Sequence, residues 1–473
     1  MGGRQRGDQV CDTMLDLVDF PAVVIASFTH RRDTRFARTQ LTTNGDVDSW
    51  QVTIVAMPEG HGVASATVTD VWVDDVTSSK PNRPALAAAA RRAHALALQS
   101  TPAPDASTLL EQESPRASVD LWNAPSGWPE ESHEDNTLTD LGLMFDRART
   151  HEVALFGYAE QLSETHWLAT TSGRRGRSDE RSARFECTAR HGTPTRSNWW
   201  GGSAAHLADI PIAESFELLM TGLRHQAKRR HLAPGNHRVL LSPSAVGDLM
   251  VDLWWAMLAV DAVEGRSVFS GSDGRLRLGE QFGPQGLRLT SDPADPLVPA
   301  SNLHLVSTSS ASASVFDNGA QIESVDWLRD GVLTSLMSDR CFSRDHDLPF
   351  TPAADTLALY VDAGHGSLGN LVARTEHAYL INCLWYNRLV DPGQLLITGL
   401  TRDGVYEVRD GEIIGAVDNF RFLQSPVKML ASIRDSSHTS RTLPREMGDY
   451  APRVAMPALL VDDFNLNSIS EAQ

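Results

Sequence analysis

A short apolar strand followed by a long, nearly all-apolar helix lies in the middle of the chain, between Val239 and Phe269. Ser242 is a suitable N-cap and Pro243 a suitable first helical residue, because a helix start leaves the N–H that proline lacks unpaired in any case. Apolar side chains then recur at helical spacing, and tryptophans widen this stripe until most sides of the helix are apolar. Such a helix must be surrounded by other elements, so we expect a core built around it, and functional residues at its start.

The length and the charge of the chain limit what it can be. With 473 residues it can form two or three domains. Its net charge of -18, from 60 acidic and 42 basic residues, argues against a broad contact with nucleic-acid phosphates or an anionic membrane. The two basic clusters, 174–177 and 228–231, are short and are interpreted as solvated loops or helix ends. We therefore predict no nucleic-acid partner and no membrane partner.

The cysteines and the apolar segments predict a cytoplasmic protein. Four cysteines are scattered without CxxC spacing, and neither a secretory leader nor an apolar run of about 18 residues is found. The expected state of these residues is a free and mostly buried thiol: Cys11, Cys187, Cys341 and Cys383.

Periodicity and turn signals predict an α+β protein with a connector between its first two parts. An N-terminal α/β module precedes a stretch rich in Pro, Ser, Glu and Asp, and a middle α+β module follows it. The last part is mainly antiparallel β with the buried helix at its start. The predicted boundaries are 1–100 for the N-terminal domain, 101–135 for the connector, 136–232 for the middle domain and 233–473 for the C-terminal domain.

Individual elements follow from the same signals. We expect helices at 84–98, 138–149 and 212–230, besides the one that starts at Ser242 and continues past Val260. Asn44-Gly45 is a typical hairpin turn, and Arg402-Asp403-Gly404 and Asp410-Gly411 predict the two turns of a three-stranded meander. The expected strands are 22–28, 34–38, 51–56, 153–161, 166–171, 183–189, 287–291, 303–308, 332–338, 395–400, 405–408 and 412–417.

Several motifs in the last third resemble those of the TldD/PmbA family. The segment 359–422 resembles the corresponding block of that family, the C-terminal domain carries most of the similarity, and weaker similarity at Leu41-Thr42-Thr43-Asn44-Gly45 extends it over almost the whole chain. The matching motifs are Ser314-Val315-Phe316-Asp317-Asn318-Gly319, Asp330-Gly331-Val332-Leu333, Trp385-Tyr386 before Val390-Asp391-Pro392, Thr398-Gly399-Leu400-Thr401-Arg402-Asp403-Gly404, and Asn419-Phe420-Arg421-Phe422.

The resemblance implies a cytoplasmic heterodimer that encloses a chamber for unfolded peptides or proteins. In that family a TldD subunit carries the metal, expected to be zinc, and a TldE (PmbA) subunit of the same fold completes the chamber. Catalytic members use two histidines of a His-Glu-x-x-x-His helix motif and a cysteine near the C-terminus as ligands. The glutamate of the motif activates water as the general base.

This chain departs from that pattern at every one of those positions. Aligning Ala245-Val246-Gly247 with the family's equivalent triplet puts Pro243 and Asp248 at the histidine positions and Ser244 at the glutamate position. Residues 442–473 contain no cysteine. We therefore predict no catalytic, metal-binding or cofactor-binding residue in this chain, and expect the metal in a TldD-type partner. Asp248 is interpreted as an acidic residue favoured near the helix start by the macrodipole.

Other motifs are weaker. The GxGxxG pattern at 364–369 lacks the βαβ context of a dinucleotide site and predicts a tight strand-to-helix turn. The spacing of His225, His231 and His237 does not suit a metal cluster, and His133-Glu134 and His151-Glu152 have no second histidine at zincin spacing. Neither Ser203 nor Ser367 lies in a nucleophile elbow. Trp199-Trp200 fits an interface anchor or core packing equally well.

Three hypotheses follow. The first is a TldE-like subunit that is not catalytic by itself and pairs with a TldD-type metallopeptidase to process or degrade peptides. The second is a stand-alone metallopeptidase with unrecognised ligands. The third is a non-enzymatic homodimer that binds an extended peptide. Each makes a different statement about the metal content and the partners of the isolated chain.

Overall fold

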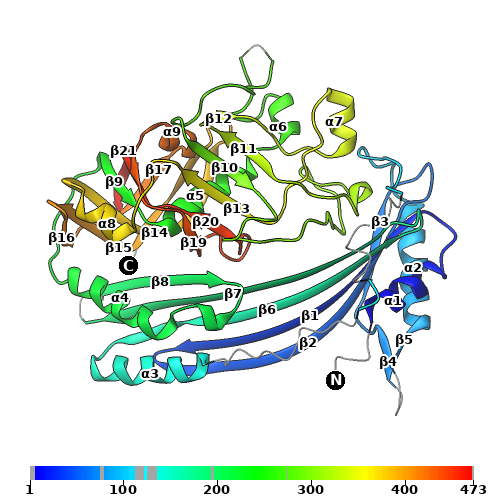
Figure 1. Cartoon of the computed structure of the whole chain (residues 1–473), viewed down its shortest axis with the longest axis horizontal. Helices are drawn as coiled ribbons and strands as arrows, with labels where there is room; N and C mark the ends of the chain where they lie inside the picture. The colour runs from blue at the N-terminus through cyan, green and yellow to red at the C-terminus, as the bar shows by residue number, and fades with distance from the viewer. Residues whose placement is uncertain are drawn as a thin grey trace.

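The computed structural model describes residues 6–74, 79–111, 122–124, 136–192, 196–272 and 274–470. The fold is α+β, as predicted. A long curved sheet lies on one side of the molecule, and the C-terminal part packs above it (Figure 1). None of the helices in the described ranges is long and apolar enough to cross a membrane.

The curved sheet contains, among the described residues, six antiparallel strands in the order β3-β2-β1-β6-β7-β8. β1 pairs with β2 on one side and with β6 on the other, so strands of the predicted N-terminal and middle domains share one sheet. The bounds are Ala22–Ala37 for β1, Gln40–Ala56 for β2, Ala64–Val68 for β3, Ala154–Thr170 for β6, Arg175–His191 for β7 and Arg196–Ala204 for β8.

Helices cover the two ends of this sheet (Figure 1). At one end α1 and α2 pack on β1, β2 and β3, and the alanine-rich face of α2 is buried there, as its sequence predicts. At the other end α3 and α4 pack together over β6, β7 and β8. The bounds are Gly7–Leu15 for α1, Arg83–Ala97 for α2, Thr137–Thr150 for α3 and Ile212–His225 for α4; β4 (Trp72–Asp74) and β5 (Ser79–Pro81) form a small ribbon.

The C-terminal part contains a small closed barrel and a second sheet. Within the described residues, β14, β9, β21, β17 and β15 pair in that order, and β15 pairs back to β14, which closes the ring. β16 extends from β15 and β18 from β21. The bounds are Gly235–Leu241 (β9), His377–Asp391 (β14), Leu396–Arg409 (β15), Glu412–Ala416 (β16), Asn419–Gln424 (β17), Ile433–Ser436 (β18) and Leu459–Ser470 (β21).

The second sheet has the described strand order β12-β11-β10-β13-β20-β19, and helix α5 (Pro243–Trp255) contacts both β14 of the barrel and β20 of this sheet. One hydrophobic core joins α5 to both sheets. The remaining bounds are Leu287–Ser291 (β10), Val325–Arg329 (β11), Val332–Leu333 (β12), Leu357–Val361 (β13), Ser440–Thr442 (β19), Val454–Met456 (β20), Ala259–Val263 (α6), Arg340–His346 (α7), Leu368–Ala373 (α8) and Pro426–Ala431 (α9).

Two predicted turns are wrong. Asn44-Gly45 lies inside β2, and the hairpin turns at Arg38 and Thr39, which both have positive φ. The hydroxyl of Thr39 donates to the carbonyl of Val153 and accepts from the N–H of Leu155, so contacts with the neighbouring strand select this turn. Arg402-Asp403-Gly404 lies inside β15.

Further predicted elements differ from the structure. The helix that starts at Ser242 ends at Trp255, because the backbone around Met257 and Ala259 bonds to Met337 instead of continuing the helix. Residues 303–308 form only an isolated bridge, and the predicted strand 332–338 is reduced to β12. Predicted strands 153–161 and 166–171 are one strand, β6.

Candidate functional site

The start of α5 is held as its sequence predicts. Ser242 is the N-cap, and its hydroxyl accepts from the N–H of Ala245 at 3.2 Å and donates to the carbonyl of Asn382 on β14. Pro243 is the first helical residue. The junction between β9 and α5 is therefore fixed to the barrel by a buried hydrogen bond, which leaves the next side chains of the helix in defined positions.

Pro243 and Ser244 line a cavity of about 310 Å³ between the curved sheet and the C-terminal part. Its walls come from β8, the segment before α4, the start of α5, α8, β14 and β19. Ser244 is 7% exposed, and among the described residues its hydroxyl oxygen has no hydrogen-bond partner. Burying a hydroxyl without a hydrogen-bond partner costs free energy of folding. The hydroxyl of Ser244 is therefore available to bond a ligand in this cavity.

Asp248 does not share that cavity. It lies one helical turn after Ser244, is fully buried, and its Oδ1 accepts from the backbone N–H groups of Glu446 and Met447 at 2.9 and 3.1 Å. Burial raises the pKa of this carboxyl well above its usual range, against the two hydrogen bonds, which lower it. The macrodipole interpretation is therefore incomplete, because the side chain anchors a loop and burial dominates its ionisation.

Two more acids lie near Asp248, yet the group does not suit a metal ion. Asp252 accepts a hydrogen bond from Asn387 at 3.2 Å, and burial, with the neighbouring charge of Glu446, raises its pKa to about 7. Over the described ranges, no group of three or more His, Cys, Asp or Glu side chains is placed to hold a metal ion. The donor set at the motif positions, a proline, a buried serine and an aspartate bonded to backbone, lacks the ligands that zinc requires.

A buried ionic cluster joins the sheet to the C-terminal part beside this helix. The guanidinium of Arg445 pairs with Asp403, lies 2.9 Å from the sulfur of Cys383, and sits 5.4 and 5.2 Å from the ring centroids of Trp199 and Trp385. Burial raises the pKa of the Cys383 thiol to about 12, so this cysteine stays protonated and is a poor metal ligand. The cluster is a structural contact between the two parts of the molecule.

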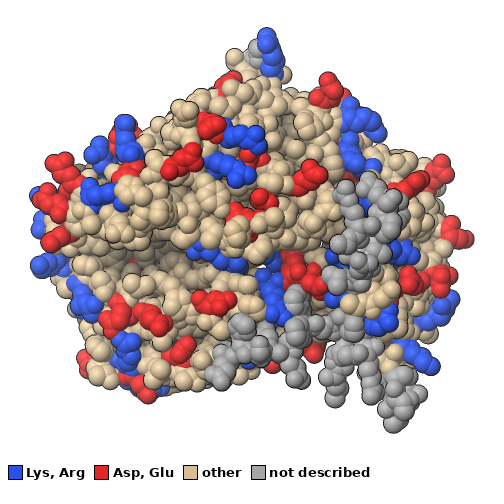
Figure 2. Space-filling view, viewed as in Figure 1, with Lys and Arg blue, Asp and Glu red and all other residues tan. Residues whose placement is uncertain are grey.

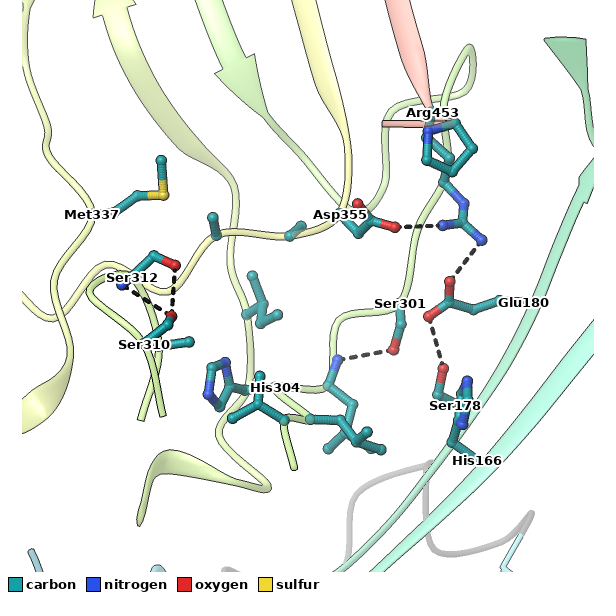
Figure 3. Close-up of a pocket in the computed structure, with 18 of the residues that line it drawn as sticks. His166, Ser178, Glu180, Ser301, His304, Ser310, Ser312, Met337, Asp355 and Arg453 are labelled. Atoms are coloured by element: carbon teal, nitrogen blue, oxygen red, sulfur yellow. Dashed lines mark hydrogen bonds and ion pairs between the residues drawn. The ribbon is translucent and has the colours of Figure 1, made fainter. Parts of the chain in front are cut away.

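A larger cleft of about 650 Å³ lies between the curved sheet and the loops of the C-terminal part. Figure 3 shows Arg453 reaching from the C-terminal side to Glu180 on β7, at 2.6 Å, and to Asp355, at 3.0 Å. Ser178 donates to Glu180 from the same strand, and Met337 lies on the opposite wall. The cleft thus combines paired charges and apolar side chains from both parts.

The surface around the cleft is mixed in charge. Figure 2 shows a furrow between the sheet and the C-terminal part, with basic side chains gathered near its middle and acidic ones beside them. On the sheet side, His166 on β6 shares a hydrogen bond of 2.8 Å with Ser27 on β1. His304 lies on the other wall, where burial lowers its pKa and its ring bonds to the carbonyl of Ser314. A mixed lining of this kind suits peptide backbone more than one strongly charged ligand.

The weaker motifs have structural contacts. His225 packs on Tyr406, His231 meets Asp418, and His237 bonds to the carbonyl of Ala233, so they do not form a cluster. His151 bonds within α3, Ser203 donates to the carbonyl of Thr442, and Ser367 caps α8 after the glycine-rich turn. His133-Glu134 lies outside the described residues.

Both tryptophans of the pair pack against hydrophobic cores, Trp199 fully and Trp200 in part. Trp199 is 4% exposed and packs in a small core with Cys383 and Leu443, whereas Trp200 is half-buried and lines the 310 Å³ cavity. Sequence reasoning did not identify the other polar residues of the two cavities, chiefly Arg441, Glu180 and Arg453. Arg453 has a sequence signal, a charge beside the apolar run Val454-Ala455-Met456, whereas Arg441 and Glu180 lie in polar segments that give none.

Comparison with known proteins gives similarities at the level of a domain and of the fold. Residues 234–468 match the model of the PmbA/TldA metallopeptidase C-terminal domain. No curated protein sequence matches the chain.

Solved structures resemble the chain over nearly its whole length. TldE from Thermococcus kodakarensis has a TM-score of 0.75 at 12% identity, covering 98% of this chain and 99% of that one. A protein from Thermotoga maritima described as a candidate modulator of a DNA gyrase has a TM-score of 0.72 at 14% identity, covering 97% and 99%. A similarly described protein from Bacteroides thetaiotaomicron has a TM-score of 0.72 at 11% identity, covering 98% of both chains. At such identities the likeness shows the fold.

Proposed function

The chain belongs to the PmbA/TldD family, and we propose that within it this protein is a TldE-type subunit that carries no metal site of its own. It pairs with a TldD-type metallopeptidase, which supplies the metal, expected to be zinc, and the general base. The pair processes or degrades unfolded peptides or proteins. This chain forms part of the wall that holds the substrate.

The observation that carries the proposal is the chemistry of the side chains at the three motif positions, Pro243, Ser244 and Asp248. Proline at 243 has no side-chain donor for a metal, and the hydroxyl of Ser244 is not basic enough to activate water. The Oδ1 of Asp248 accepts hydrogen bonds from the backbone N–H groups of Glu446 and Met447. The raised pKa of Asp248 favours the neutral carboxyl, which binds cations weakly. Metal-assisted hydrolysis at these three positions therefore needs ligands from another chain.

The cleft supports the substrate part of the proposal. Its volume of about 650 Å³ matches an extended peptide segment of a few residues. Serine hydroxyls on β7 and in the loop 301–313 offer donors and acceptors to a backbone, and Trp254, Trp255 and Met337 offer apolar contact to side chains. Such a lining accepts many sequences, which suits a subunit that handles unfolded chains.

The test is to express this chain alone, a TldD-type protein encoded in the same genome alone, and both together. Size-exclusion chromatography with light scattering measures pairing, inductively coupled plasma mass spectrometry measures the metal, and cleavage of an unstructured peptide measures activity. A matched control replaces the motif glutamate of the TldD-type protein with glutamine, which should leave pairing and metal intact and abolish cleavage.

We expect a 1:1 complex, metal that follows the TldD-type chain, and cleavage that requires both chains. Stoichiometric metal and cleavage in this chain alone would reject the proposal in favour of a stand-alone metallopeptidase. A stable homodimer that binds peptide and does not pair with the TldD-type protein would reject it in favour of a peptide-binding protein.

A further inference from the structure

The cavity beside the start of α5 is lined by a partly buried cation that forms no ion pair with the carboxylates the structure describes. Arg441 on β19 lines it, and its guanidinium donates to the hydroxyl of Ser203 at 3.3 Å and to the carbonyls of Ala204 and Leu297 at 2.9 and 3.4 Å. In the part of the chain that the structure describes, no carboxylate lies within 4 Å of it. Three hydrogen bonds use three of its five N–H groups, so two remain for a ligand.

The environment disfavours this charge and compensates it only in part. Burial lowers the pKa of Arg441 to about 10, the nearby charge of Arg453 lowers it too, and Asp209 partly opposes both. Asp209 lines the same cavity but is exposed to solvent. A partly buried guanidinium without an ion pair favours an incoming anion, because a charge-assisted hydrogen bond would offset the cost of its desolvation.

Two further features of the cavity point to an anion. The start of α5, a helix of 13 residues, lies on the wall, where the macrodipole favours negative charge, although Pro243 has no N–H and the N–H groups of Ala245 and Val246 are bonded to Ser242. The hydroxyl of Ser244 lies there too, buried and, within the described residues, without a partner. It can donate one hydrogen bond to an oxygen placed beside Arg441. A cation, a helix start and an unused hydroxyl therefore face one cavity.

The remaining walls favour an organic anion over a bare ion. Trp200, Ile210 and Leu368 line the cavity beside Gly201-Gly202. A Cβ at Gly201 would lie 2.4 Å from the ring of Trp199, and one at Gly202 would lie 2.9 Å from the ring of Trp200, so the glycines allow both rings to lie close to the strand. The volume of about 310 Å³ exceeds the space that a single small anion needs and admits one or two amino-acid residues.

We propose that this cavity binds the free C-terminal carboxylate of a peptide, with Arg441 and the hydroxyl of Ser244 on its oxygens and the last side chain against Trp200. This inference rests on the proposed function, since it specifies how the chain holds a peptide substrate. It makes Arg441 and Ser244 binding residues that select a chain end over an internal segment. Inorganic phosphate shares the chemistry of an oxyanion and is the alternative source.

The experiment uses the full chain without a partner, so its result is independent of pairing. Isothermal titration calorimetry measures the binding of N-acetyl-alanyl-alanine with a free carboxylate, of the same dipeptide as an amide, and of inorganic phosphate. The three probes are then titrated into the variants Arg441→Met, Arg441→Lys and Ser244→Ala. Arg266→Met, at an exposed arginine outside the cavity, is the matched control.

We expect the free acid to bind at least about tenfold tighter than the amide, because a charge-assisted pair is lost with the amide. Arg441→Met should remove that difference, Arg441→Lys should keep part of it, Ser244→Ala should weaken binding several-fold, and Arg266→Met should change nothing. Equal binding of acid and amide by the unmodified chain overturns the proposal without any variant. Phosphate binding as tight as the free acid overturns the assignment to a peptide end.

Discussion

The partly buried carboxyl of Asp252 should make the stability of this protein fall as the pH rises from acid to neutral. Desolvation and the charge of Glu446 raise its pKa from 3.8 to about 7, although the hydrogen bond from Asn387 and the charge of Arg388 oppose them. The folded state therefore binds the proton of Asp252 more tightly than the unfolded state does. We predict that Asp252→Asn, which keeps the shape and removes the ionisation, stabilises the protein at neutral pH.

The sign and the size follow from linkage. A pKa that is raised on folding gives stability that is fully present below about pH 3.8 and is lost as the pH rises through about 7. The loss approaches about 1.4 kcal/mol per pH unit, so the span from 3.8 to about 7 is worth about 4 kcal/mol at most. Asp252→Asn should match the wild type near pH 4 and exceed its stability by up to about 4 kcal/mol near pH 8.

Urea denaturation at about pH 4.5, 6 and 8, followed by tryptophan fluorescence, measures the difference, and Trp254 and Trp255 at the end of α5 report on this region. Asp435→Asn is the matched control, because its hydrogen bonds with Arg374 lower the pKa of Asp435. Its stabilisation is present above the unfolded pKa and lost in acid, so this variant should be less stable than the wild type at neutral pH. A pH-independent gain for Asp252→Asn would refute the reasoning.

Three further predictions concern packing and are measured by the same unfolding assay. Gly157→Ala should cost about 1 to 3 kcal/mol, because its Cβ would lie 2.0 Å from the carbonyl oxygen of Glu186 on β7; unchanged stability would contradict the strand register. Trp167→Ala should cost about 3 to 5 kcal/mol, since this fully buried ring stacks on another indole. Arg445→Met should cost up to about 3 to 5 kcal/mol, because the buried Asp403 would keep only Arg402, at 3.6 Å, as an ionic partner, and adding Asp403→Asn should restore part of it.

The sequence correctly predicted the helix starts and turns that depend only on neighbouring residues. The N-cap of α5 needs only Ser242 and Pro243, and α2 needs only an alanine-rich stretch with Asn82 as its cap. Asp410-Gly411 forms its predicted turn because Asp410 and Gly411 both have positive φ, which these residue types tolerate.

The turns that failed were decided by distant residues. Asp403 has a positive φ, as a turn would require, but its carboxylate is buried against Arg445 and the hydroxyl of Ser197, which keeps the strand running through it. The pairing of β1 with β6 across the connector has no local signal either. The 310 Å³ cavity could not be predicted from the sequence for the same reason. Ser203 and Arg441, which are hydrogen-bonded in its wall, are 238 positions apart.

The three departures from the metal motif are connected through packing, so they cannot be reversed one residue at a time. A histidine at position 248 would leave the buried N–H groups of Glu446 and Met447 unpaired, at about 1 to 3 kcal/mol each. The same loop carries Arg445, whose charge compensates Asp403 and joins the C-terminal part to Trp199 of the curved sheet. A metal site at the start of α5 would therefore need a different loop, and that loop also holds the two parts of the molecule together. Asp248 is an anchor of the fold in this chain, which is consistent with the proposal that a partner supplies the metal ligands.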